Sequence, residues 1–261
     1  MRYKLAQRHK VEKGLNSVPK KIFLSLAICI LFFLYSDLSI NAEDLPFQNG
    51  EKLEFSLKWM GIIGGKSTIE IKQESSGKNS CLLNATLRTV GLADIPFKIR
   101  DEFASLVIIN SKEVLPVWWE VIQKEKNYKY KEKTDFNEML KKEPKLQNPL
   151  SALCLLRLKD WEVGDSITVP ISVHKKDYPV KVKAVSKEPL NIYGHIFNTI
   201  LLDVAVESVG VEISSAKLKN FKIWITDDKE KLPIFMKADT SAGVITVLLD
   251  NREEFLKKIG E

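Results

Sequence analysis

The chain has 261 residues, of which 44% are hydrophobic, 28% charged and 9% aromatic. These values are typical of a globular protein, and with only twelve Gly and ten Pro they exclude disordered, collagen-like and low-complexity sequences. The formal net charge of +6 is compatible with a nucleic-acid partner, so its position along the chain has to be examined.

The positive charge lies at the N-terminus. Residues 1–42 carry seven Lys and Arg side chains and two acidic ones, which leaves a formal charge of +1 on the rest of the chain. A body this close to neutral lacks the cationic footprint that a phosphate backbone requires. We therefore expect no nucleic-acid partner.

An uncharged run at residues 22–35 follows the basic stretch. A bilayer-spanning helix needs about 20 apolar residues, so this run of fourteen is too short. A basic head, a short apolar core and a small residue predict a secretory signal at 1–42, cleaved after Ala42. The expected location is the periplasm or cell envelope, with membrane contact only through the signal. The alternative is an uncleaved inner-membrane anchor at 22–35, against which Asp37 argues.

Residues 43–261 are expected to form a single domain that retains only two cysteines, Cys81 and Cys154. An exported chain meets an oxidising compartment, so a disulfide between them is one interpretation. Burial as free thiols is favoured, because Cys81 lies in a predicted strand and Cys154 in a predicted helix. The pairing stays open at this stage.

The first half of the domain alternates between apolar and polar residues, which indicates β-strands. Residues 51–60 place four apolar side chains on one face, and Gly61, Gly64 and Gly65 are expected to turn the chain. Further strands are predicted at 66–73, 80–90, 99–109, 114–124 and 127–136.

One helix is predicted near 149–159. Asn148 is a favourable N-cap and Pro149 suits the first helical position, and an apolar run follows. Because apolar residues nearly encircle this segment, we expect the helix to be buried.

Strands resume at 166–173, 180–185, 196–209, 218–225, 234–240 and 244–249. The pattern predicts an all-β fold with a single antiparallel, strongly curved sheet of 11–12 strands, barrel-like or sandwich-like. Some strands are apolar on both faces; the adjacent Trp118 and Trp119, for example, must point to opposite sides. We expect the helix to cover the outer face, or some of these side chains to line a groove for an apolar ligand.

Motifs for catalysis are weak. Residues 61–68 resemble a phosphate-binding loop, but the spacing is one residue short and a strand follows, which favours a hairpin. Ser214-Ser215-Ala216-Lys217 has the S-x-x-K spacing but joins two predicted strands. Asp227, Asp228 and His195 could form a dispersed hydrolase site, although acidic residues are common in turns. We expect no enzyme activity, no cofactor and no metal.

Three stretches together resemble one family: Phe47-x-x-Gly50-Glu51-x-Leu53-x-Phe55, then Asn148-Pro149-Leu150-Ser151-Ala152-Leu153 with Leu156-Arg157, then Trp224-Ile225-Thr226-Asp227-Asp228 with Leu232-Pro233 and Gly243. The chain is similar, over about residues 46–250, to the bacterial domain-of-unknown-function 3108 family of exported envelope proteins. The resemblance implies a secreted, β-rich domain and no established activity, and it supplies no catalytic residues.

The functional hypothesis is a non-catalytic carrier or sensor that binds lipid or a lipoprotein acyl chain. Trp118, Trp119, Leu153 and Leu156 are the candidate ligand-binding residues, because the two tryptophans and the apolar helix supply more apolar surface than one sheet face needs. Curved sheets crossed by a helix also occur in exported lipoprotein carriers, which is an analogy of fold alone. The alternative is a structural or interaction module with a fully packed interior.

Overall fold

The computed structural model describes residues 45–74, 79–109, 113–136, 138, 145–206, 219–241 and 243–250. Within these residues lie twelve strands: β1 (Glu51–Trp59), β2 (Ile62–Gln73), β3 (Ser80–Thr89), β4 (Arg100–Ile109), β5 (Val114–Glu125), β6 (Tyr128–Asp135), β7 (Ser166–Val173), β8 (Lys176–Ile192), β9 (His195–Val206), β10 (Lys219–Thr226), β11 (Pro233–Thr240) and β12 (Gly243–Leu249). A 3-10 helix, η1 (Gly91–Asp94), and one α-helix, α2 (Pro149–Leu158), complete the set.

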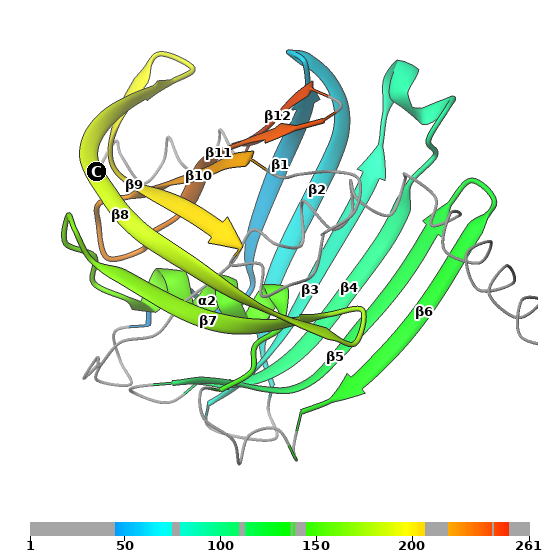
Figure 1. Ribbon diagram of the computed structural model, residues 1–261, viewed down its shortest axis with the longest axis horizontal. Coiled ribbons are helices and arrows are strands. Elements are labelled where there is room, and N and C mark those ends of the chain that lie inside the picture. The colour runs from blue at the N-terminus through cyan, green and yellow to red at the C-terminus, as the bar shows by residue number, and fades with distance from the viewer. Residues whose placement is uncertain are drawn as a thin grey trace, which may run out of the picture.

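All twelve strands form one antiparallel sheet, which confirms the predicted fold class. The strand order is β6-β5-β4-β3-β2-β1-β12-β11-β10-β9-β8-β7, so consecutive strands pair except β6 and β7, and the first strand pairs with the last. The sheet is strongly curved but open, because β6 and β7 remain as its two edges (Figure 1). The predicted signal at 1–42 and the Ser214–Lys217 motif lie outside the described residues.

Helix α2 connects the two edge strands and lies inside the curve of the sheet (Figure 1). All ten of its residues are buried, and it contacts β4, β5 and β7. The Asn148 side-chain amide donates to Ser105 Oγ, which lies on the same face of β4 as the core residues Phe103 and Val107. The expectation that the helix covers the outer face is therefore wrong. An apolar helix satisfies its own backbone groups, so it can fill the interior of a curved sheet.

The start of α2 is fixed by its sequence. The Asn148 side chain accepts from the backbone N–H groups of Leu150 and Ser151, and the Ser151 hydroxyl accepts from the Asn148 N–H. This is a capping box with Pro149 at the first helical position, as the sequence predicts. No helix in the described part of the chain has the length and apolar content needed to cross a bilayer.

The end of α2 is held by a buried ion pair. The Arg157 guanidinium donates to both carboxylate oxygens of Glu51 on β1, and to the carbonyl oxygens of Pro46 and Glu230. The Arg157 side chain is 0% exposed and stands over the Phe47 ring. A charge this deeply buried is tolerated only where hydrogen bonds satisfy it, and the Arg157 guanidinium has four such bonds.

Contacts outside the strand pairing connect the region of β7 with the region of β5 and β6. Gln147 pairs with Ile171 on the free edge of β7, and its side chain donates to the carbonyl of Val114 at the start of β5. Farther along, the rings of Tyr130 on β6 and His174 after β7 meet with centroids 4.9 Å apart. Burial lowers the pKa of His174, and nearby Glu132 opposes that shift.

Two local predictions need correction. Gly64 and Gly65 lie within β2 and not in the turn, which is formed by Met60 and Gly61. β8 is much longer than the predicted 180–185, since it runs from Lys176 to Ile192. Its second half, with Pro189, extends beyond β7 and pairs only with β9, so the missing proline N–H faces an unpaired edge.

Both cysteines are free and buried. Burial raises the pKa of the Cys81 thiol, and the same cause raises that of Cys154 strongly. The thiols therefore pack as small apolar groups.

Candidate functional site

The four residues predicted to bind an apolar ligand do not share one surface. Trp119 stacks on Phe103 inside the sheet with ring centroids 5.8 Å apart, and Leu153 and Leu156 are buried in α2. Trp118 lies on the outer face, half-buried, with the Lys133 ammonium 4.7 Å from its ring centroid. Adjacent residues of a strand point to opposite faces, as the sequence predicts for this pair. Trp119, Leu153 and Leu156 thus belong to the packed core.

The residues of the dispersed hydrolase hypothesis are engaged locally. Asp228 accepts hydrogen bonds from Thr226 Oγ1 and from the backbone N–H groups of Glu230 and Lys231, as in a turn stabilised by its own carboxylate. Asp227 lies 3.2 Å from the Lys187 ammonium. No hydrogen bond or ion pair connects either carboxylate to His195 within the described residues.

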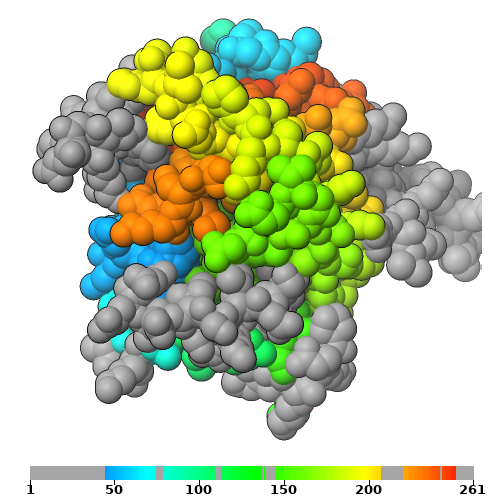
Figure 2. Space-filling model, turned by 90° about the vertical axis from the view of Figure 1, so that its left-hand side faces the viewer, coloured from blue at the N-terminus to red at the C-terminus, as the bar shows by residue number. Residues whose placement is uncertain are grey.

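A different surface stands out at one end of the sheet. Seven of the twelve large apolar side chains that are exposed among the described residues lie at the β1–β2 turn, around η1 and at the start of β12. We call them the apolar rim: Trp59 (44% exposed), Met60 (68%), Ile62 (70%), Ile63 (48%), Leu92 (80%), Ile95 (75%) and Val244 (38%). In Figure 2, sky-blue atoms from the β1–β2 region stand at the top of the molecule beside the orange-red atoms of β12.

The three parts of the rim are held together by backbone contacts. The Met60 N–H donates to the Val244 carbonyl, which ties the hairpin to β12. The Val90 N–H donates to the Gly64 carbonyl, which brings η1 against β2. A Cβ added at Gly64 would lie 3.3 Å from the Cβ of Ala93, so this approach leaves little room for a side chain. The backbones of the three segments are therefore held together at this end of the sheet.

Met60 occupies an unfavourable position within that surface. Met60 and Gly61 both have positive φ, 49° and 86°, and they form a two-residue hairpin turn. Such turns favour Asn, Asp or Gly, because a Cβ is strained in the left-handed region. A large apolar side chain here is both strained and exposed, which is the kind of local conflict found at functional sites.

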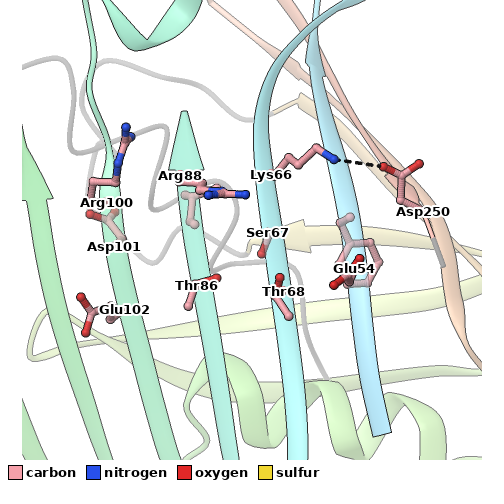
Figure 3. Close-up of a pocket in the computed structure, with 12 residues that line it drawn as sticks. Glu54, Lys66, Ser67, Thr68, Thr86, Arg88, Arg100, Asp101, Glu102 and Asp250 are labelled. Atoms are coloured by element: carbon pink, nitrogen blue, oxygen red, sulfur yellow. Dashed lines mark ion pairs between the residues drawn. The ribbon is translucent and has the colours of Figure 1, made fainter. Parts of the chain in front are cut away.

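A hollow of about 420 Å³ lies on the outer face of β1–β4. Six of the residues that line it are Glu54, Lys66, Thr68, Thr86, Arg88 and Arg100. Figure 3 shows Arg88 extending from β3 toward β2, and Lys66 extending from β2 toward Asp250. Three cationic side chains therefore stand in or beside one hollow.

Arg100 is neutralised by a neighbour from η1. Its guanidinium donates to both oxygens of Asp94, at 2.7 and 2.8 Å. These bonds, together with one from Thr89, hold the pKa of Asp94 at about 2, below its usual 3.8. Lys58, Lys66, Arg88 and Lys98 are further cations close to the rim in sequence. The rim is thus an exposed apolar surface with cationic groups behind it, which suits an anionic, amphiphilic surface.

The family follows from a comparison of the sequence. Residues 54–250 match the sequence model of DUF3108, a family described as 'Protein of unknown function'. The chain belongs to the DUF3108 family. No curated protein sequence matches it. The resemblance read from three motifs is thereby confirmed, and the Arg157 contacts show that two of those motifs meet in space, at Glu51 and Arg157.

Solved structures of similar fold are distant from this DUF3108 chain. A beta-barrel-like DUF1849 protein from Brucella abortus matches 76% of this chain and 94% of its own, with 8% identity and a TM-score of 0.39. A hypothetical protein from Chlamydia trachomatis matches 80% and 89%, with 10% identity and a TM-score of 0.29. A Bacteroides fragilis protein with a YmcC-like fold matches 85% and 98%, with 9% identity and a TM-score of 0.32.

Proposed function

We propose that this DUF3108 protein is an exported, non-catalytic protein of the cell envelope that binds the surface of a lipid bilayer through its apolar rim. The observation that carries the proposal is the rim itself: seven exposed apolar side chains on three connected segments. An isolated exposed apolar residue is ordinary, whereas a contiguous group rimmed by polar residues marks an interaction surface. Lipid therefore remains the expected ligand, and the expected contact surface is the rim and not the interior of the sheet.

The interior supports lipid binding less well than the rim does. α2 is buried along its whole length, and its residues Leu153 and Leu156 are 2% and 0% exposed. An acyl chain that contacted Leu153 or Leu156 would have to displace their packing partners, and α2 is fixed by Asn148 at one end and Arg157 at the other. The rim needs no rearrangement, because its side chains already face outward.

The chemistry of the rim suits the boundary between lipid head groups and acyl chains. Trp is enriched at that boundary because its ring is apolar and its N–H is polar. Ile, Leu and Met gain about 1.5–3 kcal/mol each when they are fully transferred from water, and partial insertion gives a share of that. Basic residues near an anionic surface add about 1 kcal/mol each. Lys58, Lys66, Arg88 and Lys98 supply this charge.

The test is sedimentation with vesicles of phosphatidylcholine, with and without phosphatidylglycerol, using the protein as purified from the envelope. Ile62→Ser and Leu92→Ser together should weaken binding to both vesicle types by more than tenfold, since each removes an exposed apolar side chain. Ile196→Ser is the matched control, because Ile196 is 72% exposed and Ile62 is 70%, but Ile196 lies at the start of β9. All forms share one N-terminus, so the contribution of that segment cancels.

Two outcomes would overturn the rim as the lipid-binding surface. One is a wild-type protein that binds neither vesicle type, which would favour an interaction module with a protein partner. The other is an equal loss of binding in the rim variant and in Ile196→Ser. Either result can be read without ambiguity if circular dichroism shows all variants folded.

Export and the lack of catalysis need their own measurements. Intact-mass analysis of the periplasmic fraction should give a chain that begins at Glu43; a mature form that retains residues 22–35 would contradict export by a cleaved signal. A broad hydrolase screen should find no activity that depends on His195 or Asp227. Loss of a measured activity in His195→Ala or Asp227→Asn would show that the protein is an enzyme.

A further inference from the structure

Cationic side chains oppose one another across the strands that form the hollow. Lys66 on β2 is in register with Arg88 on β3, and Arg88 is in register with Arg100 on β4. Side chains directly opposite in an antiparallel pair have Cβ atoms about 4.5–5.5 Å apart, and like charges there are destabilising. Three cations in one row therefore cost stability unless anions compensate them.

Four acidic residues also line the hollow, Glu54, Asp101, Glu102 and Asp250, and each has a partner of its own. Asp101 accepts a hydrogen bond from the Lys124 backbone N–H. Asp94 binds Arg100, Glu102 binds the Lys124 ammonium at 2.9 Å, and Asp250 accepts from the hydroxyls of Ser56 and Tyr193. Glu54 lies 2.5 Å from the Lys52 ammonium.

Lys66 and Arg88 are left with little compensation. The Lys66 ammonium lies 3.9 Å from the Asp250 carboxylate, at the limit for an ion pair. Arg88 lines the hollow, and within the described residues it makes no hydrogen bond or ion pair. Arg88 thus has no compensating anion among the described residues, and the neighbouring Lys66 has only the long contact to Asp250.

We infer that this hollow binds the phosphate group of an acidic phospholipid, with Arg88 as the principal donor. A guanidinium presents paired N–H donors that match two phosphate oxygens, and the Lys66 ammonium adds a point charge from the neighbouring strand. The hydroxyls of Thr68 and Thr86, in the next cross-strand row, offer further donors. The bound phosphate would remove the repulsion between Lys66 and Arg88. This inference rests on the proposed function, since it assigns the head group of the lipid that the rim contacts.

The distance between rim and hollow agrees with a bilayer surface. Lys66 follows Ile62 by four residues on β2, which corresponds to about 13 Å along a strand at about 3.3 Å per residue. Apolar faces of interfacial proteins enter about 5–10 Å below the boundary between head groups and acyl chains. With the rim inserted to that depth, Arg88 and Lys66 stand at the level of the lipid phosphates.

The test compares Arg88→Gln with Lys181→Gln in the same vesicle assay. Lys181 is an exposed cation on β8 that does not line the hollow, so the two variants lose the same charge. Arg88→Gln should weaken binding to phosphatidylglycerol vesicles by about fivefold, the equivalent of about 1 kcal/mol per cation. Binding to phosphatidylcholine vesicles should fall by less, because the choline group neutralises the phosphate of that lipid. Arg88→Lys should recover part of the loss, because it keeps the charge without the paired donors.

The outcomes separate this inference from the proposed function. Equal losses in Arg88→Gln and Lys181→Gln would mean that only net charge matters, and the hollow would not be a phosphate site while the rim proposal stands. A wild-type protein that binds no vesicles would overturn both. Calorimetry with inorganic phosphate then identifies the source: saturable binding that requires Arg88, without vesicle binding, would assign the hollow to a free phosphate and contradict the lipid head group.

Discussion

Strand β1 joins two regions of opposite character. At its first residue, Glu51 binds Arg157 in the interior, and every polar group of that contact has a partner. At its last residue, Trp59 is 44% exposed and belongs to the rim, next to a strained turn. The Arg157 region follows the rules for a stable interior, and the rim departs from them. The satisfied, buried contact at Glu51 is what a stable fold requires. The exposed apolar side chain at Trp59, beside a strained turn, is a cost to the fold that is typical of functional sites.

The largest expected effect comes from breaking the buried ion pair. Arg157→Met should lower the free energy of unfolding by about 3–5 kcal/mol, because the Glu51 carboxylate is left without its cation. Urea unfolding measures it. Replacing both partners, Arg157→Met with Glu51→Leu, should restore part of the loss, since no uncompensated charge then remains. The matched surface change is Lys187→Met, which removes a partly exposed cation and should cost about 0–1 kcal/mol. Equal effects from Arg157→Met and Lys187→Met would show that the pair is not what fixes α2.

The sequence predicts the Arg157 region far better than the rim. Asn148 and Pro149 mark the start of α2 by rules that act within one helical turn, and strict alternation marks most strands. The partner of Arg157 is a long-range contact that no local pattern contains, although both residues stood in the motifs that indicated the family. β8 extends beyond the predicted 180–185 at both ends, across Pro179 and Pro189, because its length is set by pairing with neighbouring strands, which is a long-range property.

The rim was missed for a different physical reason. The sequence pattern predicts the end of one strand and a turn for Trp59–Ile63, and turns are normally polar. Leu92 and Ile95 are separated from it by about thirty residues, so their meeting depends on the pairing of β2 with β3. The sequence contains one sign of the rim: Met60, a large apolar residue, stands directly before the turn residue Gly61. In the same way, the cross-strand row of Lys66, Arg88 and Arg100 becomes visible only once the register is known.

The second largest effect concerns the cap of α2. Asn148→Ala should lower the free energy of unfolding by about 1–2 kcal/mol, because two helix N–H groups lose their acceptor in a buried site. Ser105 loses its hydrogen bond from Asn148 as well. Asn148→Asp is the sharper comparison, since it keeps the acceptor for the helix and removes the donor to Ser105. Thermal unfolding that ranks alanine below aspartate supports the cap; equal losses in the two variants would assign the stability to the Ser105 contact, which both of them lose.

A substitution in the rim should change the free energy of unfolding by less than these two, and should raise it. Met60→Asn should raise the free energy of unfolding, by up to about 1 kcal/mol, because Asn-Gly is the preferred pair for this turn. Vesicle binding should fall in the same variant, since an exposed apolar side chain is lost. A higher free energy of unfolding together with weaker vesicle binding in Met60→Asn is the result expected if Met60 serves lipid binding at a cost in stability. If stability falls instead, Met60 contributes packing against Gly243, which its side chain approaches closely.

The smallest effect is a pH dependence at the junction of rim and hollow. Hydrogen bonds from Arg100, and then from Thr89, lower the pKa of Asp94 from 3.8 to about 2. A lowered carboxylate pKa stabilises the folded state fully above pH 3.8, and that contribution is lost as the pH falls from 3.8 through about 2. Because the pair is exposed, the change should be confined to the η1 region. Carbon-detected NMR of Asp94 follows the titration directly, and Arg100→Gln should return the pKa toward its ordinary value. An Asp94 that titrates near 3.8 in the wild type would mean that the Arg100 pair does not persist in solution, and Arg100 would then join Lys66 and Arg88 as a third available cation.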